Sequence, residues 1–143
     1  MEDIRVMMQQ VIQEYNETVD PEVSQLLDWR RTTIYCLQEA GPMLGYALKM
    51  KNASEFEYKR AKATAIVRLH QAAQANGGIL PNGIKFTMSY AKDIGIYEDP
   101  MLANASNASA EADSEAAQWR VLVEAWKKTS DALAKELSFK SDI

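Results

Sequence analysis

The stretch Asp99–Leu137, DPMLANASNASAEADSEAAQWRVLVEAWKKTSDALAKEL, is the most regular part of the 143-residue chain. Its apolar and small residues recur in alternating steps of three and four, which is the a/d pattern of a coiled coil over about five heptads. This seam consists of Leu102, Ala105, Ser109, Ala112, Ala116, Trp119, Val123, Trp126, Ser130, Leu133 and Leu137. The pattern predicts a long, coiled-coil-like helix over 99–138, which needs another helix, another chain, or both to cover it.

The seam leaves two partners open. Its first half carries mostly Ala and Ser, whereas its second half carries large side chains whose full burial contributes roughly 1.5–3 kcal/mol each. We therefore expect the stable core in the second half. One interpretation is packing within the chain, and the other, which we favour, is homo-oligomerisation. The residues assigned to contacts between subunits are Leu102, Trp119, Val123, Trp126, Leu133 and Leu137.

The segment 1–52 is predicted to form the N-terminal helices. Apolar residues at helical spacing indicate a short amphipathic helix over 3–16. Asp20-Pro21-Glu22 is typical of a helix start, with Asp as the cap and Pro at the first helical position. Gly41-Pro42 is expected to break or kink this second helix, which then resumes up to Asn52.

The middle of the chain is predicted to hold a basic helix and an irregular connector. Ser54 with Glu57 three residues later forms a capping-box pattern that starts the basic helix over 54–75. Asn76-Gly77-Gly78 ends that helix. The connector over 76–98 allows a hairpin within 79–90 or a short helix capped by Thr87, and we favour the short helix. The whole chain is thus predicted to be one all-α domain, 1–143, with a helical hairpin.

Composition limits the class of protein. The net charge of −4 is the sum of −6 over 1–28, +5 over 29–75 and −3 over 76–143. A mildly acidic chain with a basic middle can bind a polyanion locally. The single cysteine, Cys36, fits a reducing compartment, and no secretory signal or membrane-spanning run is recognisable. We expect a cytoplasmic protein, in the host cytoplasm if a phage encodes it.

Catalytic motifs are not evident in this sequence. One histidine and one cysteine do not make a zinc site or a nucleophilic triad, and His70 is expected to be a partly buried packing residue. Glu14 and Glu17 form a lone ExxE pair without the second acidic pair that a metal-dependent all-α enzyme needs. We therefore predict a non-enzymatic protein without a cofactor or metal.

A basic cluster in the middle of the chain gives the one chemical direction. It consists of Lys49, Lys51, Lys59, Arg60, Lys62 and Arg68. Phe56 and Tyr58 lie among these cations. Lys and Arg neutralise phosphates, and exposed aromatic rings stack on unpaired bases, so the cluster predicts a nucleic-acid-binding surface. The alternative is a solvated helix face balanced by Glu55, Glu57 and the acidic N-terminal segment.

The chain from about Glu55 onward resembles the small helical phage recombination mediators of the UvsY type. The resemblance rests on the order of three features: the basic helix Glu57–Leu69, the short capped element Thr87–Asp93, and the long Ala- and Glu-rich helix opened by Asp99-Pro100. It covers roughly three fifths of the chain. Where the family carries a Lys-x-Arg pair on the basic helix, Arg68 matches the Arg and Ile66 occupies the place of the Lys.

This resemblance implies a homo-oligomeric protein that binds single-stranded DNA. Proteins of this kind help to load a RecA-like recombinase onto DNA covered by single-strand-binding protein, so both are implied partners, and a membrane is not. The alternative function is a helical structural, assembly or adaptor protein with no role in nucleic-acid binding. Such a protein would share the long helix and the oligomer but would not need the basic cluster.

Overall fold

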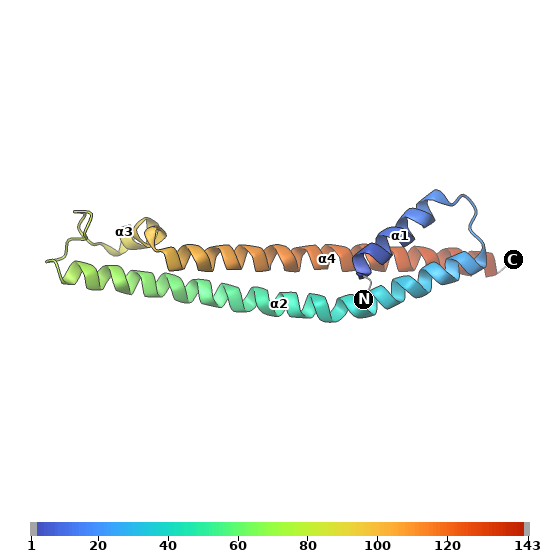
Figure 1. The fold of residues 1–143 in the computed structure, drawn as a ribbon, viewed down its shortest axis with the longest axis horizontal. Coiled ribbons are helices and arrows are strands. Elements are labelled where there is room, and N and C mark those ends of the chain that lie inside the picture. The colour runs from blue at the N-terminus through green and yellow to red at the C-terminus, as the bar shows by residue number, and fades with distance from the viewer. Residues whose placement is uncertain (1–2, 142–143) are drawn as a thin grey trace. The chain divides into compact units, whose positions relative to one another are not determined.

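The computed structural model describes residues 3–141, and this part of the chain is all-α. Its elements are α1 (Ile4–Glu17), α2 (Val23–Gln74), α3 (Met88–Asp93), the 3-10 helix η1 (Gly95–Glu98) and α4 (Pro100–Ser141) (Figure 1). Within residues 3–141, the sole strand-like pairing is an isolated bridge between Ile79 and Lys85. A search of the same residues finds that every helix is too short or too polar to cross a lipid bilayer.

The described chain divides into two compact units, and each is treated by itself. Unit 1 takes the chain up to Ala47 and from Ala116 onward, whereas unit 2 is the continuous segment Leu48–Glu115. Both α2 and α4 contribute residues to each unit. That 1–143 forms one domain therefore stays a prediction.

In unit 1, α1 packs with the first part of α2 and the last part of α4. The amphipathic helix predicted over 3–16 is α1. Asp3 caps it by accepting the amide of Arg5 at 2.9 Å, and this hydrogen bond holds the pKa of the Asp3 carboxyl below its usual value. The core of the unit consists of Val11, Leu26, Trp29, Leu133 and Leu137, with Tyr15 packed against it. The prediction that large side chains of the α4 seam form a core is confirmed here.

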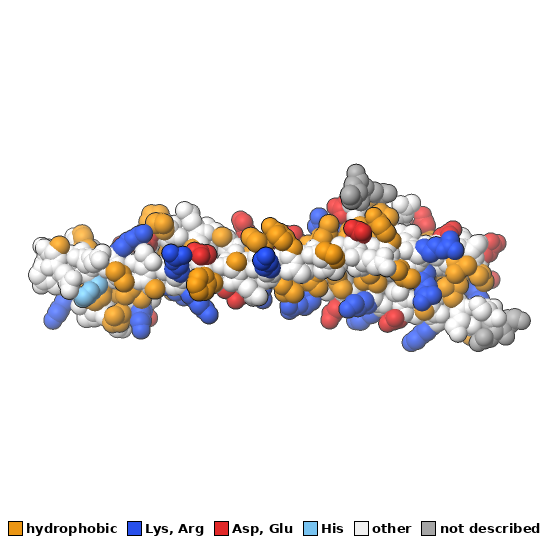
Figure 2. Space-filling view, turned by 90° about the horizontal axis from the view of Figure 1, so that it is seen from below, with side chains coloured by type: hydrophobic (Ala, Val, Ile, Leu, Met, Phe, Trp, Pro, Cys, Tyr) orange, Lys and Arg blue, Asp and Glu red, His pale blue; other side chains and the backbone are white. Residues whose placement is uncertain are grey.

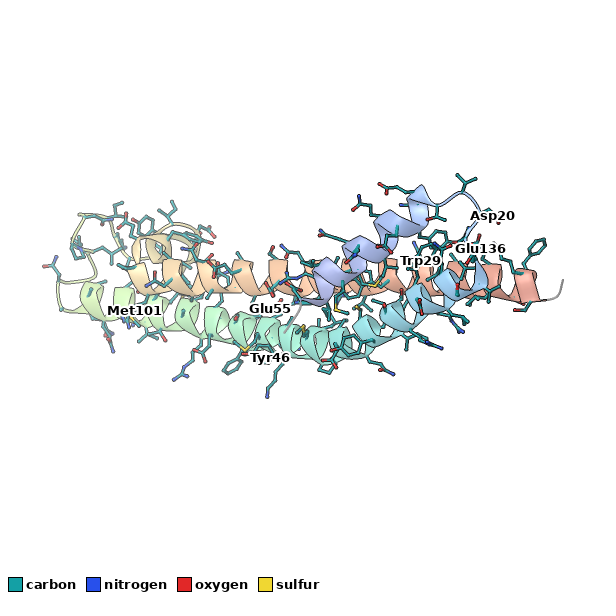
Figure 3. The ribbon with its side chains drawn as sticks, turned by 45° about the vertical axis from the view of Figure 1, so that its right-hand side comes forward. Asp20, Trp29, Tyr46, Glu55, Met101 and Glu136 are labelled. Carbon is teal, nitrogen blue, oxygen red and sulfur yellow. The ribbon has the colours of Figure 1, made fainter. Side chains whose placement is uncertain are left out.

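Two hydrogen bonds fix α1 to this core, and Figure 3 labels one residue of each, Trp29 and Glu136. The Tyr15 hydroxyl donates to Glu136 on α4 at 2.6 Å, and the Trp29 indole on α2 donates to Glu14 at 2.9 Å. The rings of Tyr15 and Trp29 are stacked with their centroids 5.6 Å apart. Because its hydroxyl donates to a carboxylate, Tyr15 has a pKa raised to about 12.

The Tyr15–Glu136 hydrogen bond makes part of the stability dependent on pH. The folded-state pKa lies above the ordinary value of 10, so the contribution is complete below pH 10 and is lost as the pH rises through about 12. We expect Tyr15→Phe to lower the free energy of unfolding at pH 8, and the gap to the wild type to shrink by pH 11. Urea unfolding of both proteins at the two pH values tests this, and a constant gap would contradict it.

The start of α2 differs from the prediction. The helix begins at Val23, and the amide of Glu22 donates to the side chain of Gln25 at 2.9 Å, which is one half of a capping box. Asp20 lies two residues before this cap and instead forms an ion pair with Lys140 of α4, with the Lys140 nitrogen also bonded to the Pro21 carbonyl. Asp20 therefore ties the α1–α2 loop to α4 rather than capping a helix.

The predicted interruptions of α2 are wrong. The helix runs through Gly41-Pro42 and through Ser54 as one 52-residue element. Local signals are overridden because an inward stripe continues across both places: Cys36, Ala40 and Ala47 are buried on either side of Pro42. Ser54 is half-buried inside the helix, so it is not an N-cap. The segments predicted as 1–52 and 54–75 thus share a single helix from residue 23 to 74.

Two glycines inside α2 have no packing role within the chain. A Cβ added at Gly41 or Gly45 would meet no atom of residues 3–141 within 4 Å, apart from its chain neighbours and the backbone of its own helix, and neither glycine has a positive φ. Glycine inside a helix costs about 0.5–1 kcal/mol relative to alanine because it loses more backbone freedom on folding.

We therefore expect Gly41→Ala and Gly45→Ala each to raise the free energy of unfolding by about 0.5–1 kcal/mol in chemical denaturation. The control is Gly95→Ala, whose Cβ would lie 2.8 Å from Leu69 Cδ1 and 3.3 Å from the Tyr90 ring. That variant should lose stability. A loss of stability in the Gly41 or Gly45 variant would mean that the glycine is required for the helix.

In unit 2, the end of α2, the connector and the start of α4 form a helical hairpin (Figure 1). The end of α2 matches the prediction, since Gly77 has a positive φ and the Gly78 amide donates to the Ala73 carbonyl at 2.7 Å. A turn at 80–83 and the Ile79–Lys85 bridge follow. The favoured short helix is confirmed as α3, with the Thr87 hydroxyl accepting the Tyr90 amide at 3.1 Å. The long helix begins at Pro100, as predicted, and extends to Ser141.

Candidate nucleic-acid interface

The six cations predicted to bind nucleic acid all belong to the part of α2 in unit 2. The segment 48–74 contains these six cations and two acids, Glu55 and Glu57, so its net charge is 6 − 2 = +4. The whole of unit 2 is neutral, because its eight bases are matched by eight acids. The position of each cation therefore decides whether a polyanion meets positive charge.

Lys51 and Arg68 connect α2 to α4 and are partly neutralised. Lys51 Nζ lies 3.1 Å from Asp113 Oδ1, and the Lys51 side chain is only 28% exposed. Arg68 donates to Asp99 Oδ2 at 3.0 Å and to the Met101 sulfur at 3.2 Å. These ion pairs lie at the surface and contribute little net stability, but they keep both cations next to carboxylates of unit 2.

Asp99 has a second role at the start of α4. Its Oδ1 accepts the Met101 amide at 2.9 Å while Oδ2 accepts from Arg68. The Asp99 carboxylate thus caps α4 and forms an ion pair with Arg68 of α2 at the same time. Arg68 is therefore a brace for the start of α4 in the free protein.

This dual role predicts an order of stabilities. Asp99→Ala removes both the cap and the ion pair and should cost about 1–2 kcal/mol of unfolding free energy, whereas Arg68→Ala removes one surface pair and should cost at most about 1 kcal/mol. Asp99→Asn keeps a capping oxygen and should lie closer to the Arg68 variant. Urea titrations of the three variants test the order. Equal losses in Asp99→Ala and Asp99→Asn would mean that the cap contributes nothing.

Lys62 and Tyr58 form a separate pair on α2. The Lys62 ammonium lies 4.5 Å from the centroid of the Tyr58 ring, which is cation–π geometry. Tyr58 packs against the core cluster of Ala65, Ile96 and Leu102. One face of this aromatic ring is thus occupied by a cation, and the ring is only partly exposed.

Lys49, Lys59 and Arg60 are exposed and hold no tertiary ion pair within the described residues. Arg60 has a carboxylate near it, Glu57 at 3.9 Å in the same helix, and both side chains are mostly in solvent. Phe56 lies seven residues after Lys49 and four before Arg60, so all three fall on one side of the helix. Figure 2 views the side of the molecule on which α2 lies and shows Lys and Arg side chains alternating with hydrophobic ones.

A groove of about 450 Å³ runs beside Arg60 and Arg68 in unit 2. Small side chains contribute much of its lining, so a backbone or a phosphate can approach closely. The lining residues are Glu57, Arg60, Ala61, Thr64, Arg68, Met101 and Ala105. Two guanidinium groups therefore line this groove, and one of them, Arg60, also belongs to the exposed cations.

The six residues assigned to contacts between subunits are all buried by the chain itself. Leu102 packs with Ala65 and Ile96 in unit 2, and Leu133 and Leu137 belong to the core of unit 1. Trp119 and Trp126 meet edge to face at 6.5 Å, the Arg5 guanidinium covers Trp119 at 5.3 Å, and Val123 is 8% exposed. Packing within the chain, the alternative interpretation, accounts for the seam. That these six residues also form contacts between subunits stays a prediction.

Two of the titratable residues weighed as catalytic or metal-binding candidates have structural contacts. Glu14 accepts from the Trp29 indole, whereas Glu17 accepts from Gln13 within α1. The His70 ring packs on Phe86 with centroids 5.1 Å apart, but the residue is exposed rather than partly buried as predicted. A search of residues 3–141 finds no group of three His, Cys, Asp or Glu side chains placed to hold a metal ion.

The chain matches no known protein family, no curated protein and no solved structure.

Proposed function

We propose that this protein binds single-stranded nucleic acid through the exposed side of α2 in unit 2. The observation that supports this best is that Lys49, Lys59 and Arg60 are exposed and hold no tertiary ion pair among the described residues. Phosphates can approach these cations without breaking any contact that holds the fold. Lys51, Lys62 and Arg68 contribute to the positive potential while they shape the scaffold.

The biological role that we propose is that of a non-enzymatic recombination mediator. The resemblance of residues 55–143 to the UvsY type supports this role, and it implies a RecA-like recombinase and a single-strand-binding protein as partners. A mediator needs to hold DNA without chemistry, which suits a surface built from cations and one exposed ring.

Phosphate contacts make such binding dependent on salt. Each phosphate that a cation neutralises releases condensed counterions, so the logarithm of the binding constant falls with the logarithm of the salt concentration by about 0.7 per contact for a single strand. Because unit 2 is neutral overall, its acids limit long-range attraction. We therefore expect binding that is measurable at low salt and weak at about 0.2 M salt.

The test is the fluorescence anisotropy of a labelled oligo-dT strand. We expect the combined variant Lys49→Gln, Lys59→Gln and Arg60→Gln to bind more weakly at low salt and to flatten the salt slope by about 2, the product of three contacts and about 0.7 each. Its helicity should be unchanged, because these side chains are exposed and hold no tertiary ion pair within residues 3–141.

The matched control removes three positive charges elsewhere. Arg120, Lys127 and Lys135 are exposed on the α4 segment of unit 1. Changing all three to Gln alters the net charge equally but leaves the proposed site intact, so affinity and slope should stay close to those of the wild type. Equal losses in the two combined variants would exclude a localised site on α2.

Self-association is part of this proposal, since several copies would place several basic segments on one DNA strand and increase the avidity. The surface for it lies outside the buried α4 seam. In unit 1, α2 exposes Val23, Leu27 and Ile34 by 39–42% of their surface, at spacings of four and seven residues. This stripe is apolar and lies at helical spacing on a single face.

The same stripe favours the second candidate function, a helical assembly or adaptor protein with no nucleic-acid role. Such a protein would use the exposed apolar residues of α2 and would not need Lys49, Lys59 and Arg60. No binding of oligo-dT at low salt, together with self-association in analytical ultracentrifugation, would support this second function over the first.

A further inference from the structure

The two aromatic residues within the basic cluster differ in what covers them. Tyr58 packs against the core of unit 2 and carries the Lys62 ammonium 4.5 Å above its ring. Phe56 is 65% exposed, and within residues 3–141 neither an aromatic ring nor a cation is stacked on it. A bound molecule can therefore reach the Phe56 ring without displacing any side chain.

The neighbours of Phe56 on the helix surface combine charge with small size. Lys59 and Arg60 follow it by three and four residues, which places their side chains next to the ring. Ala53 and Ala63, three before and seven after, are exposed and add little bulk along the same side. The ring thus stands above a shallow surface with cations at one turn's distance.

We propose that Phe56 stacks on an unpaired base and thereby makes this surface prefer single strands to duplexes. The inference rests on the proposed function and adds a residue that reads the bases rather than the phosphates. In a duplex the bases are already stacked on one another, so Phe56 has no free base to meet. In a single strand the ring adds a contact that every base can make, because each base has a π face.

The measured affinity for a strand combines two contributions, phosphate contacts and base stacking, and this assignment predicts how each one can be measured separately. Cations act on phosphates and set the salt slope, whereas stacking adds affinity that is independent of the number of counterions released. Removing Phe56 should therefore lower the affinity for a strand with bases and leave the salt slope unchanged. Removing the cations should change the slope, as described above.

The experiment compares the full-length wild type with Phe56→Ala on two labelled strands about 20 nucleotides long. One is oligo-dT, and the other is an abasic strand with the same number of phosphates. We expect Phe56→Ala to weaken binding to oligo-dT by about tenfold or more, with no change in binding to the abasic strand. Phe56→Trp should restore the affinity, and Phe56→Leu, which keeps an apolar side chain without a ring, should not.

The control is Phe139→Ala. Phe139 is 72% exposed on α4 in unit 1, so its loss removes a comparable ring far along the sequence from the basic segment. It should leave the affinity for both strands unchanged. Circular dichroism of each variant reports whether the helices remain.

The outcomes separate the two proposals. Failure of the wild type to bind either strand would overturn the proposed function and this inference with it. Equal binding of the wild type to oligo-dT and to the abasic strand, unchanged in Phe56→Ala, would overturn the role of Phe56 and leave the phosphate-binding function standing. A similar loss in Phe56→Ala and Phe139→Ala would also overturn it, because the effect would then not be local.

Discussion

Burial of the α4 seam is the constraint on which both units depend. The helix presents large apolar residues in steps of three and four, and the chain itself covers each of them. In unit 1 the cover comes from α1 and the first part of α2, through Val11, Leu26 and Trp29. In unit 2 it comes from Ala65 and Ile96, next to Leu102.

The same packing divides the cations of α2 into two kinds. Those beside the buried stripe, Lys51 and Arg68, are within reach of carboxylates on the neighbouring segment and become braces. The others, Lys49, Lys59 and Arg60, are exposed and hold no tertiary ion pair within the described residues. A neutral unit can therefore present a positive side. Net charge describes the average of a surface, whereas a ligand of a few nucleotides meets one side of it.

The sequence predicts those helix starts and ends that depend only on residues close together in the chain. The Thr87 cap, the glycine stop after α2 and the start of α4 at Pro100 are local signals, and all are present. It fails at Pro42 and Ser54, where burial on both sides maintains a helix that local preferences would end. For the candidate site, the sequence identifies the cations and aromatic rings. Which of them are free depends on partners such as Asp99 and Asp113, which are far along the chain.

The two units differ strongly in how many residues separate the partners of their tertiary contacts along the chain. Arg68 and Asp99 in unit 2 are 31 residues apart, whereas Tyr15 and Glu136 in unit 1 are 121 residues apart. Closing a longer loop costs more chain entropy, and distant pairings slow folding. During synthesis, unit 2 therefore has all its partners first. Leu26 and Trp29 can pack against Val11 and Tyr15 of α1 early, but they lack Leu133 and Leu137 until the last turns of α4 have been made. In that interval a chaperone or another nascent chain can compete for the part of their apolar surface that α4 later covers.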